Sequence, residues 1–156
     1  MTEFTSAILD SQGDVSHWHY VAYDQLNRDL LPDEEGIGLI FIETSWKAKQ
    51  LPYHKQKLAL LLSNQRHFAL EMQDAGYPVR YVFSEKEYGE ILGGICKELG
   101  KITATKPAEL TLRRSLQPLI DSGEIKLLDH KGWLTTTEDF TKGAGQNAPW
   151  RMDKFY

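Results

Sequence analysis

The chain has 156 residues, a length typical of one domain. Hydrophobic residues make up 41% and charged residues 26%, which excludes a disordered chain. A net charge of −4 excludes a strongly basic nucleic-acid clamp, and a single cysteine excludes an internal disulfide, a multi-cysteine zinc site and an iron–sulfur cluster held by this chain alone.

The N-terminal part of the chain predicts little regular structure before a first strand. Residues 1–16 mix short apolar stretches with Ser, Thr, Asp and Gly, and predict a loosely ordered tail whose acidic, polar start is unlike a signal peptide. The aromatic residues 18–23 predict a strand, and residues 25–31 a short helix that ends before Pro32. The apolar run 38–42 is typical of a strand that is buried on both faces.

The clearest helix is predicted to start at Pro52 and to end at Gly76, because a first-turn proline loses no intrahelical bond and glycine is a common C-cap. Its apolar residues recur at steps of three and four, interrupted only by Gln65. Further along, we expect a strand at 79–83, a helix at 85–99, a strand at 101–105, a helix at 108–122 and a strand at 125–128. A helical turn at 138–142 precedes a Gly- and Pro-containing segment at 143–149.

This alternation of strand and helix predicts an α/β fold: a Rossmann-like three-layer domain with a five-stranded parallel sheet over residues 17–145. Such a sheet binds its ligand beyond the carboxyl ends of its strands. No apolar run approaches the ~20 residues of a membrane span. We therefore expect a cytoplasmic protein with no membrane partner.

Polar residues follow the first two predicted strands. Asp24 and Gln25 follow the first strand, and Glu43 follows the second. A carboxylate and an amide can fix the hydrogen-bonding edges of a ring in a mostly apolar pocket. Alternatively, Asp24 and Gln25 cap the helix that comes next. Residue type alone leaves both interpretations open.

A cationic cluster surrounds the predicted start of the long helix and consists of Lys47, Lys49, His54, Lys55 and Lys57. It would suit a phosphate, a ribityl chain or an acidic surface, with added positive potential from the helix N-terminus. The alternative is a solvated face. Arg66 and His67 likewise either face a partner domain or are surface charge, and the helix dipole is sufficient to explain Glu109.

The remaining reactive residue types carry weaker signals. Cys96 lies among apolar helix residues and is expected to be a small buried hydrophobe. His17 and His19 point the same way on a strand, but no further metal ligands are marked. No P-loop, nucleophile-elbow or zinc-protease motif is present. The residues alone therefore indicate a small-molecule-binding α/β domain with no visible catalytic set.

Several stretches resemble one family in order along the chain. His54-Lys55-Gln56-Lys57-Leu58-Ala59 and the following residues to Ala69 resemble the H-K-x-K-I-A-x-x-x-S-A-M-R-H-F-A helix of bacterial photolyase-related proteins, the iron–sulfur branch of the cryptochrome/photolyase superfamily. Shorter stretches are similar to G-D-Q-L, G-Y-x-V-x-Y, P-G-E, F-L-[ST]-[ST] and R-M-E-Y-F-Y-R of that family. They are residues 23–26, 76–81, 107–109, 133–136 and 151–156.

The resemblance implies an antenna-type domain that holds a lumazine-type light-harvesting chromophore. Asp24, Gln25, Glu43 and Glu109 would supply polar contacts, with Lys47 and His54 at the rim. FAD and the iron–sulfur cluster would belong to a C-terminal helical domain, the partner in the same parent protein, and DNA would be reached only through that parent. Residues 146–156 would begin the linker to that domain. The late aromatics Trp133, Trp150, Phe155 and Tyr156 could pack against the same helical domain.

On this interpretation the chain is a fragment without catalytic activity of its own. Its parent resembles a DNA photolyase, a carbon–carbon lyase, or a light-sensing cryptochrome. Three positions depart from the family pattern: Tyr23 stands for a glycine, Lys47 for an acidic residue, and Leu110-Thr111 for Trp-Arg. The bulky Tyr23 ring predicts a partly filled pocket. Two other functions therefore stay open: a stand-alone nucleotide- or small-molecule-binding module, and a docking domain without ligand.

Overall fold

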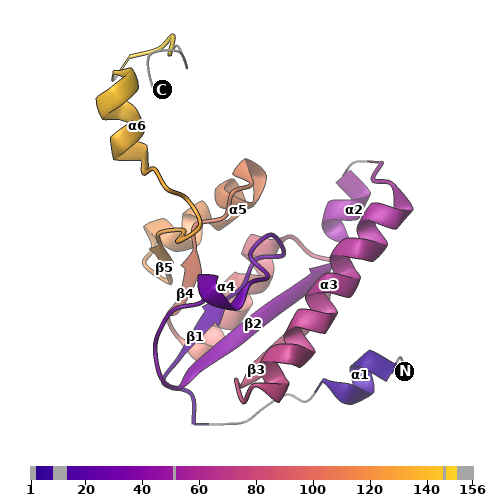
Figure 1. Cartoon of the computed structure of the whole chain (residues 1–156). Helices are drawn as coiled ribbons and strands as arrows, with labels where there is room; N and C mark the ends of the chain where they lie inside the picture. The colour runs from indigo at the N-terminus through magenta and orange to yellow at the C-terminus, as the bar shows by residue number, and fades with distance from the viewer. Residues whose placement is uncertain (1–2, 9–13, 51, 146, 151–156) are drawn as a thin grey trace.

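A computed structural model describes residues 3–8, 14–50, 52–145 and 147–150. Its centre is one sheet of five parallel strands in the order β3-β2-β1-β4-β5 (Figure 1). The strands are β1 (His17–Tyr20), β2 (Ile37–Thr44), β3 (Val79–Ser84), β4 (Ile102–Thr105) and β5 (Ile125–Leu128). The predicted five-stranded parallel α/β sheet is confirmed.

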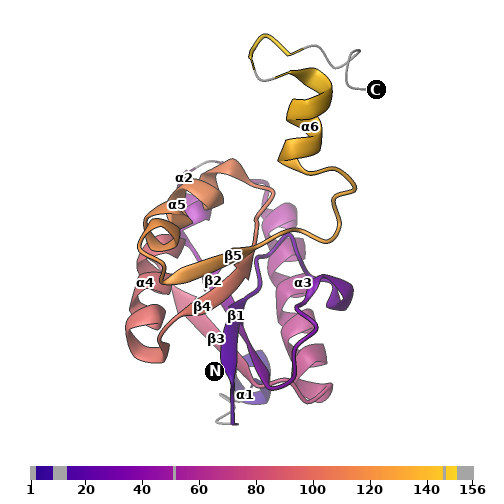
Figure 2. The ribbon, with the colours of Figure 1, turned by 90° about the vertical axis from the view of Figure 1, so that its left-hand side faces the viewer.

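Helices cover both faces of this sheet, as Figure 2 shows edge-on. α3 (Lys55–Asp74) lies on one face, while α4 (Tyr88–Leu99) and α5 (Leu110–Asp121) lie on the other. Alternate residues of β2 serve the two cores: Leu39 and Phe41 pack with α3, and Ile40 and Ile42 pack on the side of α4 and α5. This two-sided burial explains the continuous apolar run of β2.

The pairing of the two central strands leaves room for one large ring. Trp18 of β1 lies opposite Gly38 of β2. A Cβ atom at Gly38 would lie 2.6 Å from the Trp18 ring. Glycine therefore allows the indole to lie flat against the neighbouring strand.

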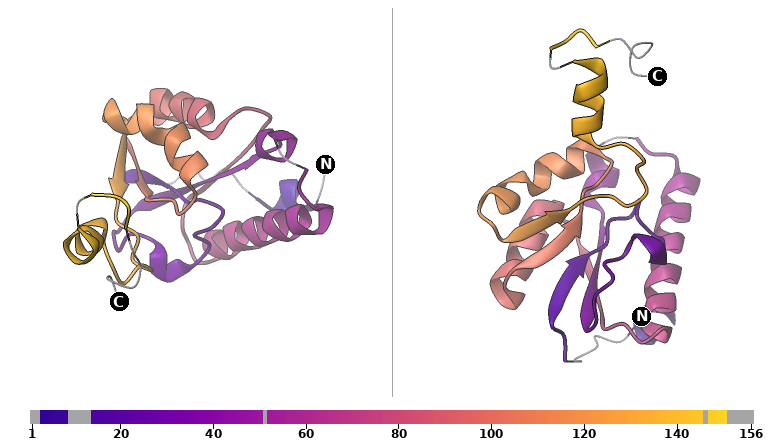
Figure 3. Two further views of the ribbon diagram at one scale, coloured as in Figure 1. Left: turned by 90° about the horizontal axis from the view of Figure 1, so that it is seen from above. Right: turned by 60° about the vertical axis from the view of Figure 1, so that its left-hand side comes forward.

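The remaining helices are shorter: α1 (Glu3–Ala7), a 3-10 turn η1 (Arg28–Leu30), α2 (Trp46–Gln50) and α6 (Thr137–Ala144). Both views in Figure 3 show α6 standing away from the sheet. Among the described residues, no helix has both the length and the apolar character that crossing a membrane requires.

Four local predictions differ from the structure. In the expected loose tail, α1 forms and places Phe4 edge-on to Tyr81, with ring centroids 4.8 Å apart. The helix predicted at 25–31 is only η1, which Asn27 caps. α6 is a full helix rather than a turn, because Thr136 and Asp139 form a reciprocal capping box.

The start of the long helix is also different. α3 begins at Lys55, where His54 is the N-cap and accepts a hydrogen bond from the Gln56 amide. Pro52 precedes it. The separate helix α2 was not predicted. It forms directly after β2, where the Thr44 hydroxyl accepts a hydrogen bond from the Trp46 amide and donates one to the Lys86 carbonyl.

Candidate functional site

A cavity of about 470 Å³ opens at the carboxyl edge of the sheet, beside the end of β2. Figure 1 shows α2 and the first turns of α3 at this end of β2. The lining comes from the ends of β1 and β2, from α2 and α3, and from the starts of α4 and α5: Tyr23, Ile42, Glu43, Thr44, Ser45, Lys47, Ala48, Tyr53, Lys57, Leu58, Leu61, Leu62, Gln65, Tyr88 and Glu109. This is the edge at which such sheets bind ligands, as the sequence predicted.

The first half of α3 forms the apolar wall. Leu58, Leu61 and Leu62 continue the stripe that buries Phe68 and Met72 lower on the same helix. The sheet lies beneath the lower residues, whereas the three leucines face the cavity and stay partly exposed. One periodic stripe thus serves first as a binding wall and then as core.

A polar network braces the base of this wall. Arg66 of α3 donates two hydrogen bonds to the Glu43 carboxylate, at 2.8 and 2.6 Å, and the Tyr81 hydroxyl donates a third at 2.9 Å. Gln65 donates to the Ile42 carbonyl at 3.0 Å and to the Tyr81 oxygen at 3.1 Å. The hydrogen bonds to Glu43 raise the pKa of Arg66, and burial raises that of Tyr81. The Glu43 carboxylate is therefore already engaged.

A second charged group closes the cavity on the side of β1. The Lys47 ammonium contacts both the Tyr23 hydroxyl and the Glu109 carboxylate, and lies 4.2 Å from the Tyr23 ring centroid. Burial lowers the pKa of Lys47, which the charge of Asp24 partly offsets, and burial raises the pKa of Glu109. Glu109 is the N-cap residue of α5 but makes no side-chain capping bond, and its carboxylate contacts Lys47.

The structure brings together three of the six predicted site residues, Glu43, Lys47 and Glu109. The other three lie outside the lining. Asp24 is exposed, His54 caps α3, and the buried Gln25 donates to the carbonyls of Thr105 and Lys106 at 3.3 and 3.1 Å. Gln25 thus ties the end of β1 to the end of β4.

The predicted cationic cluster is dispersed. Lys49 pairs with Glu85 at 2.9 Å, and Lys55 is exposed outside the cavity lining. Lys57 reaches the lining, with its ammonium 5.6 Å from the Tyr53 ring centroid. Two of the five cations, Lys47 and Lys57, therefore belong to the cavity.

Sequence reasoning missed several lining residues. Gln65 had a visible signal, because it is the single polar residue in the apolar stripe of α3. Ser45 also had one, because it follows the second predicted strand at its carboxyl end. Tyr53 and Tyr88 had none, since only the tertiary fold brings them to the same edge. The Ser45 hydroxyl is buried and has no hydrogen-bond partner among the described residues.

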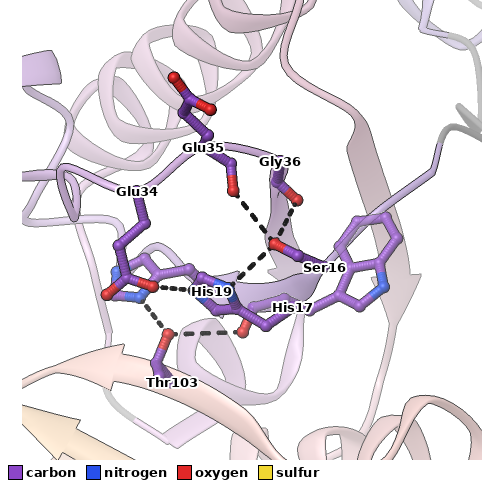
Figure 4. Close-up of polar contacts among 8 residues, drawn as sticks. Ser16, His17, His19, Glu34, Glu35, Gly36 and Thr103 are labelled. Atoms are coloured by element: carbon purple, nitrogen blue, oxygen red, sulfur yellow. Dashed lines mark hydrogen bonds and ion pairs between the residues drawn. The ribbon is translucent and has the colours of Figure 1, made fainter.

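The two histidines of β1 have structural partners (Figure 4). His19 is 1% exposed, and its Nδ1 lies 2.9 Å from the Thr103 hydroxyl. His17 Nε2 lies 3.2 Å from a Glu34 carboxylate oxygen. In the described ranges, no cluster of three or more His, Cys, Asp or Glu side chains is arranged to hold a metal. Burial, followed by the charges of His17 and Lys131, lowers the pKa of His19 to about 4.

Cys96 is buried as predicted, and burial raises its pKa to about 11, which is typical of an inert thiol. Of the late aromatics, Trp133 and Trp150 are exposed, and the Trp150 indole donates to the Gly145 carbonyl at 2.9 Å. Phe155 and Tyr156 lie outside the described residues, as does most of the predicted linker at 146–156.

Comparison with known proteins decides the family. The model of a family described as deoxyribodipyrimidine photo-lyase-related protein matches residues 19–156, most of the chain. The chain belongs to this family. A (6-4) photolyase of Agrobacterium fabrum (strain C58 / ATCC 33970) is 23% identical to the photolyase-related chain over 133 residues, 80% of the chain and 26% of that enzyme. The chain thus spans about a quarter of the length of this curated relative.

Three of the stretches that carry the resemblance border the cavity of the photolyase-related chain. The long motif from His54 to Ala69 lies on α3 and its N-cap and forms the apolar wall. Tyr23 and Glu109, from two of the short motifs, meet at Lys47. The family resemblance and the cavity therefore concern the same edge of the sheet.

Proposed function

We propose that this chain is an antenna-type α/β domain, which holds a flat aromatic chromophore in the cavity at the end of β2 for an FAD-binding domain of the same parent protein. The light-driven chemistry, DNA repair or light sensing, belongs to that neighbour, together with any iron–sulfur cluster. The chain by itself is proposed to bind and not to catalyse.

The observation that carries this proposal is the shape and lining of the cavity. Its volume lies within the roughly 300–1,000 Å³ of small-molecule sites. Leucines of α3 form one wall, and the rings of Tyr23, Tyr53 and Tyr88 contribute elsewhere in the lining. Such a lining suits a planar ring, which gains from apolar contact and from stacking on aromatic side chains.

Rigidity is the second support. The rate of energy transfer to a neighbouring chromophore depends on the relative orientation of the two chromophores. The Glu43–Arg66–Tyr81 network joins β2, α3 and β3 directly beneath the apolar wall. These residues therefore hold the wall in position. Because the Glu43 carboxylate is already hydrogen-bonded, the other polar groups of the lining would recognise the ring.

The test is ligand binding by the whole chain. We expect riboflavin or a lumazine to bind, with quenched ligand fluorescence, a visible absorption band in the purified complex and a raised melting temperature. Leu61→Trp fills the cavity and should abolish binding. Leu60→Trp is the matched control, because Leu60 is the adjacent helix residue, is 61% exposed and is outside the lining.

A chain that stays colourless, leaves both ligands fluorescent and gains no thermal stability contradicts the antenna function. Equal loss of binding in Leu61→Trp and Leu60→Trp would also contradict the assignment of the cavity, because the control leaves the lining unchanged.

A docking domain without ligand is the second candidate, and the contact of Lys47 with Tyr23 and Glu109 favours it. These three side chains fill space beside β1. A domain that binds no ligand has no need to keep that space open. Tyr23→Gly separates the two functions. If the wild-type chain binds no flavin and Tyr23→Gly binds it, the tyrosine has replaced the chromophore.

A nucleotide-binding module has less support. Its motivation was a cluster of lysines, but Lys49 is paired with Glu85 and Lys55 is outside the lining. Charge reversal at Lys49 should leave ligand binding unchanged. If inorganic phosphate stabilises the wild-type chain and this substitution abolishes the effect, the nucleotide hypothesis is restored.

A further inference from the structure

One positive charge at the cavity has no partner among the described residues. The lining contains two carboxylates, Glu43 and Glu109, and two ammonium groups, Lys47 and Lys57. Glu43 is neutralised by Arg66, and Lys47 by Glu109. Lys57 is left, because no carboxylate of the described residues pairs with it.

The position of Lys57 places this charge at the mouth rather than at the base. It lies in the first turn of α3, its side chain is exposed, and its ammonium lies 5.6 Å from the Tyr53 ring centroid. The charge of Lys57 also lowers the pKa of Lys47, so the two ammonium groups sense each other across the cavity. The N-terminus of the 20-residue helix α3 adds positive potential at the same point.

A hydrogen-bonding group is unused beside the same end of β2. The Ser45 hydroxyl lines the cavity, is buried and has no partner among the described residues. A buried hydroxyl without a hydrogen bond is costly. A polar substituent on a bound ligand would relieve that cost.

We infer that the ligand of this cavity is a planar aromatic molecule whose tail carries an anionic group, such as a phosphate or carboxylate, and that Lys57 selects this group at the mouth. The inference rests on the proposed function and deepens it. The ring lies along the leucines of α3, and the anion lies in the field of Lys57 and the helix start.

Riboflavin and FMN provide the test, because they share one ring system and differ by a phosphate. We expect the whole chain to bind FMN roughly fivefold more tightly than riboflavin, the size expected of a partly exposed charge-assisted contact. Fluorescence titration at low and high ionic strength should show this preference fall with salt. Lys57→Gln should remove the preference, so that FMN and riboflavin then bind with similar affinities.

Lys55→Gln is the matched control. It removes the same charge from the same helical turn, but Lys55 is outside the lining, so FMN should keep most of its preference. A preference that survives in Lys57→Gln, or that Lys55→Gln abolishes equally, overturns the role of Lys57. Equal affinities of the wild-type chain for riboflavin and FMN overturn the inference while the antenna function stands. Failure of both flavins and of lumazine to bind overturns both.

Discussion

At the scale of single residues, the Glu43 carboxylate shows how a partner changes the role of a side chain. Its side chain is only 13% exposed and receives three hydrogen bonds, two of them from Arg66. A charge in such a place is stable only while its partner is present. Glu43 therefore acts first in holding α3 against the sheet.

Removing the partner of Glu43 tests this role. We expect Arg66→Gln to lower the free energy of unfolding by about 1–3 kcal/mol, because it leaves a mostly buried carboxylate without its bidentate partner. Urea denaturation measures the change. Lys49→Gln breaks the exposed pair with Glu85 and should cost under about 0.5 kcal/mol. Equal costs in the two variants would mean that the network does not brace the wall.

The buried His19 contributes to the loss of stability in acid. Burial holds it neutral in the folded chain, where its pKa is lowered from 6.5 to about 4. The unfolded chain takes up the proton first, so this contribution is complete above pH 6.5 and is lost as the pH falls towards 4. The loss reaches at most about 3 kcal/mol.

The pH dependence of unfolding isolates this contribution. Between pH 6.5 and 4, the wild-type free energy of unfolding should fall more steeply than that of His19→Gln, which has no imidazole to protonate. Replacement of the exposed His67 by Gln should leave the wild-type slope. Parallel profiles for wild type and His19→Gln would show that His19 does not control acid stability.

At the scale of elements, α3 divides into a core half and a cavity half. Met72 is fully buried, whereas Leu61 is partly exposed to the cavity. Met72→Ala should cost about 2–5 kcal/mol by removing packed core volume. Leu61→Ala should cost well under half as much and should instead weaken flavin binding. Similar costs in chemical denaturation would indicate that the upper half of α3 is also core.

The packing of α4 against α5 gives another test at this scale, because α4 contains glycines in opposite surroundings. A Cβ atom at Gly89 would lie 2.3 Å from the Ser115 carbonyl oxygen, while nothing lies within 4 Å at Gly94. Gly89→Ala should force the helices apart and cost about 1–3 kcal/mol. Gly94→Ala should stabilise by about 0.5–1 kcal/mol through helix propensity. Thermal unfolding of both variants should show shifts of opposite sign.

At the scale of the whole molecule, the strand order determines which residues meet. Because β1 lies between β2 and β4, the residues that follow these three strands converge at one edge. Tyr23, Lys47 and Glu109 are thereby brought together from three parts of the chain. Their contact joins the two halves of the sheet across the cavity.

A double-mutant cycle on Lys47→Met and Glu109→Gln measures this link. We expect a coupling of about 1 kcal/mol in the free energy of unfolding, reduced at high salt because both side chains are partly exposed. A coupling near zero would show that the pair adds no stability across the cavity. Any change in the flavin affinity of the two single variants would then reflect only the changed shape of the cavity.

Much of the architecture was predictable from local patterns. The two-sided apolar run of β2 and the three- and four-residue steps of α3 need no tertiary information. Helix ends and short elements were harder. α2, η1 and α1 depend on particular contacts, such as the Thr44 hydroxyl at the Trp46 amide and the Phe4 ring on Tyr81, which leave no periodic trace.

The sequence by itself determined the family, through its motifs, and the parallel α/β fold with the edge at which the cavity opens, because apolar periodicity and chain order control the fold. Only the tertiary structure decided the chemistry of that edge. Whether Glu43 or Lys57 remains free for a ligand depends on which charge comes close enough to neutralise it, and distances between strand ends are set by the packed sheet and not by spacing along the chain.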